Sequence, residues 1–133
     1  MSLKGFVTAF GSFLIIDFIW LNFVAKNFYF ERMQHVGNLI DGKIKISLMP
    51  GLFVYVLLAL GITYFVLPKS SNNDTFYSVF VSGAILGLVI YGVYDLTNMA
   101  TLKSWPLSLA LADVAWGAVA TGVVSYISFS VSK

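Results

Sequence analysis

Four apolar stretches constrain this chain more than any other feature of its sequence. Each is near the roughly 20 residues that an α-helix needs to cross a bilayer, and they run Gly5–Val24, Leu48–Leu67, Phe76–Met99 and Pro106–Ser128. Inside a bilayer the backbone must satisfy its own hydrogen bonds, which only helices and closed barrels do. The sequence therefore predicts an all-α integral membrane protein: a four-helix bundle of up-down topology, forming one transmembrane domain over residues 1–133.

The composition agrees with this class and excludes others. Hydrophobic residues make up 59% of the chain and charged residues 11%, which is more apolar surface than a soluble domain of this size could cover. The chain has no cysteine and one histidine, His35, so disulfides and sites built from Cys or several His are excluded. A net charge of +2 gives no indication of nucleic acid. We expect the lipid bilayer as a partner, no nucleic acid, and no cofactor or metal ion.

The connector from Ala25 to Ser47 is the longest and mixes charged with aromatic residues. This mixture predicts an interfacial segment, with a short helix that lies in the headgroup region and ends near Gly42. The first and third connectors hold five Lys and Arg against three on the opposite side. The positive-inside rule therefore favours a cytoplasmic location for these two connectors.

Three acidic residues, Asp17, Asp95 and Asp113, lie inside the apolar stretches. A carboxylate at that depth costs roughly 2.5–3.5 kcal/mol on insertion scales, and such residues normally mark function. Ser104 lies in the short connector between the third and fourth stretches. Asp95 precedes it by nine positions and Asp113 follows it by nine, so two antiparallel helices bring the two aspartates to one level. Asp17 lies eight residues before Ala25, roughly 12 Å from the same membrane face. The spacing predicts a single layer of three carboxyl groups.

Aromatic and polar companions accompany these carboxyl groups. Trp20 follows Asp17 by three positions and Trp116 follows Asp113 by three, which makes each pair neighbours on one helix face. Such a pair offers a carboxylate and an aromatic ring face, the two elements that attract a cation.

The third apolar stretch carries a seam of small residues, Gly83-x3-Gly87. Such a seam lets another helix approach closely. We therefore expect the polar end of the helix face that carries the seam to point into the bundle. The predicted ligand-binding residues are Asp17, Trp20, Tyr55, Tyr91, Asp95, Thr97, Asn98, Asp113 and Trp116, and the three aspartates are also the catalytic candidates if the protein is an enzyme. Trp105 is interpreted as a membrane-interface anchor.

The run Tyr94-Asp-Leu-Thr-Asn-Met-Ala-Thr-Leu-Lys-Ser-Trp-Pro106, with Asp113-Val-Ala-Trp-Gly117 after it, resembles a bacterial family of small predicted membrane proteins of unknown function. That family is marked by a Y-D-L-T-N-x-A-T-L-x-x-W-P core, and its opening D-x-x-W-L is similar to Asp17–Leu21. Ser104 stands where the family has glycine. The resemblance covers nearly the whole chain and implies four transmembrane helices in the bacterial inner membrane, a multi-pass location. It implies no activity.

Three functions fit these features. The first is a module that binds a cationic or polar small molecule in the acidic layer and translocates it with proton coupling; by analogy with small multidrug transporters, a path between four short helices would need a homodimer. The second is a membrane-embedded enzyme that acts on an isoprenoid, acyl or other lipid substrate by carboxylate acid–base chemistry, or that holds Mg²⁺ against a phosphate. The third is a non-catalytic membrane assembly factor.

Overall fold

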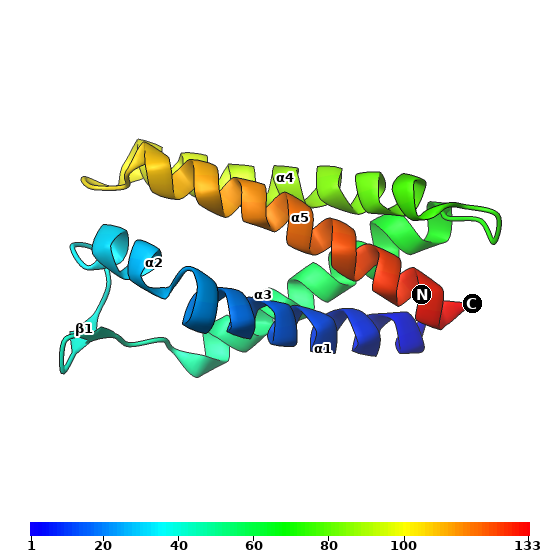
Figure 1. Cartoon of the computed structure of the whole chain (residues 1–133), viewed down its shortest axis with the longest axis horizontal. Helices are drawn as coiled ribbons and strands as arrows, with labels where there is room; N and C mark the ends of the chain where they lie inside the picture. Colours follow the sequence, from blue (N-terminus) through cyan, green and yellow to red (C-terminus); the bar gives the residue numbers. More distant parts are fainter.

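The computed structural model describes residues 1–133 and consists mainly of four long helical segments (Figure 1). Their bounds are α1 Leu3–Ile19 extended by a π-helical turn, Trp20–Val24; α3 Leu48–Gly61 extended by a π-helical turn, Ile62–Val66, and a 3₁₀ turn, Leu67–Lys69; α4 Phe76–Thr101; and α5 Leu107–Ser132. All four segments are long and apolar enough to cross a membrane. The predicted all-α membrane bundle is confirmed, and both termini lie at one end of it (Figure 1).

Helix α5 is the central element of the bundle. It packs along α4 on one side and against α1 on the other, while α3 packs against α1 and reaches α4 and α5 through its final turns. In Figure 1, α4 and α5 run together and α3 crosses the bundle obliquely. The centre of the core is formed by Phe13, Leu58, Ile62 and Val124. This arrangement gives α5 contact with every other long segment, so residues on α5 can meet partners from all of them.

The close packing of α4 on α5 depends on glycine. A Cβ atom on Gly87 would lie 2.7 Å from Thr121 Oγ1, and one on Gly83 would lie 2.6 Å from Ser125 Cβ. Both distances are shorter than van der Waals contact, so only glycine allows this approach of the two backbones. The predicted seam is therefore present, and α5 is the helix that fills it.

The first connector differs from the expectation. Its short helix, α2, spans Lys26–Met33 and ends well before Gly42. The chain then forms a two-stranded antiparallel hairpin, β1 Leu39–Ile40 with β2 Lys43–Ile44. Asp41 and Gly42 have φ values of 52° and 72°, the left-handed conformation that a tight two-residue hairpin turn requires and that Asp-Gly adopts readily. Gly42 is thus a turn residue and not a helix cap.

Candidate functional site

Asp17 joins three helices. It lies on α1 with 8% of its surface exposed, and each carboxyl oxygen accepts one hydrogen bond. Trp116 Nε1 on α5 donates to Oδ1 over 2.7 Å, and the Tyr55 hydroxyl on α3 donates to Oδ2 over 2.9 Å. Hydrogen bonds to a charged group are stronger than neutral ones. The bonds to Asp17 therefore tie α1, α3 and α5 together at this depth.

Asp113 obtains its donor from outside the four long segments. The hydroxyl of Tyr29, on α2, donates to Asp113 Oδ1 over 2.7 Å and accepts from Trp20 Nε1 over 3.3 Å. The Trp20 ring stacks on the ring of Trp116, with centroids 4.3 Å apart and planes 4° from parallel. Burial raises the pKa of the Tyr29 hydroxyl well above its ordinary value, and the Asp113 charge adds to this, so Tyr29 stays a donor at neutral pH.

These contacts explain why the Asp-x2-Trp spacing occurs twice. Helices α1 and α5 are antiparallel (Figure 1), so the two pairs meet head to tail. Asp17 binds the indole of the other pair directly, and Asp113 binds the other indole through Tyr29. The two carboxyl groups therefore have reciprocal environments on either side of one indole stack.

Asp95 is the most deeply buried of the three, with no exposed surface. Its Oδ1 accepts from Trp105 Nε1 over 3.0 Å, whereas its Oδ2 has no donor. The carboxyl group of Asp113, on α5, is its neighbour. Two carboxylates side by side in a medium that solvates them poorly repel each other, and a proton or a cation between them would relieve that repulsion.

We refer to the three carboxyl groups and their donors Tyr29, Tyr55, Trp105 and Trp116 as the acidic cluster. Its members come from α1, α2, α3, α4, α5 and the turn between α4 and α5. No group of three or more His, Asp or Glu side chains is arranged to hold a metal ion. The chemistry available is that of hydrogen-bond acceptors, indole faces and a protonatable carboxyl pair.

The remaining predicted site residues lie at different distances from this cluster. Tyr91 packs its ring against Gly117 on α5, among the core residues next to the cluster. Asn98 lies beside Tyr94. Thr97 is exposed, and its backbone carbonyl accepts a hydrogen bond from the Thr101 hydroxyl. Thr97 therefore lies outside the cluster.

Sequence reasoning missed two members of the cluster. For Trp105 the sequence favours a membrane-interface anchor over a ligand contact, yet the indole donates a hydrogen bond to Asp95. The available signal is the place of Trp105 directly after the turn that follows α4. Tyr29 was assigned to an interfacial segment, and nothing in the local pattern indicates that it reaches Asp113. Its position follows from the way α2 continues beyond the end of α1 on the side of α5 (Figure 1), where Tyr29 and Arg32 bond to Asp113 and Ser108.

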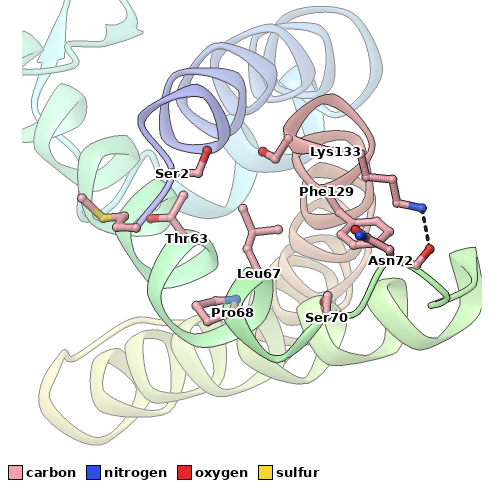
Figure 2. A pocket seen from close by; sticks show the side chains of 10 residues that line it. Ser2, Thr63, Leu67, Pro68, Ser70, Asn72, Phe129 and Lys133 are labelled. Carbon is pink, nitrogen blue, oxygen red and sulfur yellow. Dashed lines mark hydrogen bonds between the residues drawn. The ribbon is translucent and has the colours of Figure 1, made fainter.

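The structure has one cavity beside the acidic cluster and another at the opposite end of the bundle. A groove of about 340 Å³ lies between α4 and α5 and contains Asp95; its other lining residues are Leu88, Gly92, Leu96, Met99, Leu107, Ala110, Leu111 and Val114. A second cavity, of about 280 Å³, lies at the end of the bundle that holds the termini (Figure 2). It is lined mainly by polar side chains, and Lys133 Nζ donates to the Asn72 carbonyl at its rim. Only the first cavity touches the acidic cluster.

The fold and the cluster define a multi-pass membrane protein whose helices are joined by buried carboxyl groups. A family model described as a predicted membrane protein, DUF2177, matches residues 2–130. The chain belongs to this family, as the resemblance indicated, and contact with the lipid bilayer follows from its four apolar helices. Comparison with curated proteins and with solved structures gave no match.

Proposed function

We propose that this protein binds a cationic or polar small molecule at the Asp95–Asp113 pair and moves it across the membrane in exchange for a proton. One observation carries the proposal: the fully buried carboxyl group of Asp95 has one oxygen without a donor and lies beside a second carboxyl group, that of Asp113. We expect the two groups to share a proton. If that proton leaves, two neighbouring negative charges remain in a medium that solvates them poorly, and a cation is the species that relieves this cost.

The other contacts of the acidic cluster support this assignment of roles. Asp17 has a donor on each oxygen, so we assign it to holding helices together. Asp95 and Asp113 have fewer donors than acceptor sites and are assigned to binding. Transport by four short helices requires a wider path than one copy encloses, so the proposal includes a homodimer. We propose the bacterial inner membrane as its location.

Infrared spectroscopy of purified protein tests the shared proton directly. We expect a protonated carboxyl band at neutral pH in the wild type that disappears or shifts in Asp95→Asn and Asp113→Asn and persists in Asp17→Asn. Absence of the band in the wild type between pH 6 and pH 8 (roughly neutral conditions, well above the ordinary carboxyl range near 4) would remove proton exchange from the proposal.

Proteoliposomes that enclose a pH-sensitive dye test transport. With an imposed proton gradient, we expect uptake of at least one lipophilic cation from a panel of tetraphenylphosphonium, ethidium and dodecylamine, accompanied by proton efflux. The Asp95→Asn variant should abolish both fluxes. Uptake that proceeds without proton movement, or that Asp95→Asn leaves intact, contradicts the exchange mechanism.

The apolar lining of the groove next to Asp95 favours one alternative, an enzyme that acts on a lipid-soluble substrate. A carboxylic acid beside a carboxylate can supply a general acid and a general base. The two functions differ in what happens to the ligand. Mass spectrometry of ligand recovered from the proteoliposomes should find it unchanged if the protein is a transporter, and converted if it is an enzyme.

A further inference from the structure

The groove between α4 and α5 opens away from the bundle. Four of the leucines that line it, Leu88, Leu96, Leu107 and Leu111, are 53%, 65%, 58% and 63% exposed. In a membrane-spanning pair of helices such exposed apolar side chains face lipid. A molecule dissolved in the bilayer can therefore reach this groove sideways, without passing through water.

Glycine gives the groove its depth. A Cβ atom on Gly92 would have no neighbour within 4 Å, in contrast to Gly83 and Gly87 on the same helix, where a Cβ atom would collide with α5. Gly92 is therefore not needed for helix packing. Its missing side chain leaves open space in the wall of the groove.

Asp95 is the one polar residue in this lining. Asp95 brings to this otherwise apolar lining a buried carboxyl group with one oxygen that has no donor. A surface that only contacted lipid chains would gain nothing from a carboxyl group and would pay its insertion cost. The carboxyl group complements a positively charged hydrogen-bond donor, and the leucine walls complement an alkyl chain.

We propose that the groove between α4 and α5 is a lateral entrance and binding site for an amphiphile that carries a protonated amine on an alkyl chain. The amine binds Asp95, and the chain lies between Leu88, Leu96 and Leu111. This inference rests on the proposed function, because it names the ligand class and the route by which the ligand reaches the Asp95–Asp113 pair.

The chain offers two blocking variants and a matched control. Gly92→Leu puts a side chain into the groove from a position where the Cβ atom meets no neighbour within 4 Å, and Leu111→Trp narrows the groove from the opposite wall. Gly11→Leu is the control, because a Cβ atom on Gly11 in α1 also has no neighbour within 4 Å, but Gly11 lies outside the groove. Circular dichroism and thermal melting establish that each variant is folded, and Leu111→Trp keeps the test decisive if Gly92→Leu does not fold.

The measurement is calorimetric titration of protein in nanodiscs with dodecylamine and, separately, with dodecanol. We expect wild type and Gly11→Leu to bind dodecylamine alike, and Gly92→Leu, Leu111→Trp and Asp95→Asn to bind it at least tenfold more weakly. Dodecanol, which has the same chain but no charge, should bind the wild type at least tenfold more weakly than dodecylamine. Equal binding of the alcohol and the amine would overturn the assignment of ligand class.

The outcomes separate this inference from the proposed function. If Asp95→Asn loses binding and the blocking variants do not, the carboxyl site remains and the lateral entrance is wrong. If none of the variants affects binding, both proposals fail. If Gly92→Leu converts a dimer to a monomer and leaves amine binding intact, the groove is an interface between two copies, and the entrance is again wrong.

Discussion

At the scale of single residues, the three intramembrane aspartates have different hydrogen-bond environments. Asp17 accepts a bond on each oxygen, from Trp116 and from Tyr55. Asp95 accepts one, from Trp105, and its other oxygen has no donor and lies near the carboxyl group of Asp113. The effect of an Asp→Asn substitution on stability should therefore differ between positions 17 and 95.

We predict that Asp95→Asn melts at or above the wild-type temperature, whereas Asp17→Asn is destabilised by about 1–3 kcal/mol. An asparagine at position 95 keeps an acceptor for Trp105 and adds an amide donor for Asp113, so no shared proton is needed. An asparagine at position 17 replaces one acceptor oxygen by a donor that faces an indole or phenol donor. Thermal melting in detergent measures both. If Asp95→Asn unfolds the protein, the carboxyl group is a structural clamp, and the assembly-factor hypothesis gains the most.

At the scale of secondary-structure elements, α4 presents two kinds of glycine. Gly83 and Gly87 lie against α5 and permit close packing, whereas Gly92 lies beside the open groove. The hydroxyl groups of Thr121 and Ser125 on α5 fill the space beside Gly87 and Gly83. The packing of α4 on α5 thus uses small residues on one helix and short polar side chains on the other, which is common where helices associate in membranes.

A pair of alanine substitutions on α4 tests this division. Gly87→Ala should destabilise the protein by about 1–3 kcal/mol, the usual cost of forcing extra atoms into a packed interface. Gly92→Ala should be neutral or stabilising by about 0.5–1 kcal/mol, because alanine favours a helix over glycine and meets no neighbour. Reversible unfolding in mixed micelles gives both values. Equal effects at the two positions would show that α4 and α5 are not packed as described.

At the scale of the whole molecule, the two ends of the bundle differ in composition. The acidic cluster lies toward the end that carries α2, the hairpin and the α4–α5 turn, and the termini and the polar cavity lie at the other end (Figures 1 and 2). Basic residues are more numerous in the connectors at the cluster end. In a chain that crosses four times the cluster lies nearer one membrane face, and from the positive-inside rule we expect this to be the cytoplasmic face.

Labelling of single cysteines can test this topology without background, because the natural chain has no cysteine. We expect a membrane-impermeant maleimide applied to whole cells to label Lys4→Cys and Ser71→Cys, and to label Lys43→Cys and Lys103→Cys only after permeabilisation. The reverse pattern would correct the orientation and leave the four-crossing topology intact. Labelling of Lys4→Cys and Ser71→Cys from opposite sides would contradict the topology itself.

Local pattern was enough to predict the four helices and the common depth of the carboxyl groups. Depth along a helix depends only on residue spacing and the rise per residue, so Asp95 and Asp113, equidistant from the hairpin turn, had to lie at one level. The hairpin at Asp41–Gly42 was also readable, because Asp-Gly is a strong signal for a tight hairpin turn, but Gly42 was interpreted as the end of a helix.

Only the tertiary structure decided which donor each carboxyl group meets. That choice depends on how far each helix is rotated about its axis. The rotation is set by packing between residues that are distant in sequence, such as the contact of Thr121 with Gly87. Trp116 reaches Asp17 across 99 positions, and Tyr29 reaches Asp113 across 84. The sequence determined the helices and the level of their acidic residues, because both follow from local spacing; the pairing of Asp95 with Asp113 and the groove beside them came from contacts that no local pattern encodes.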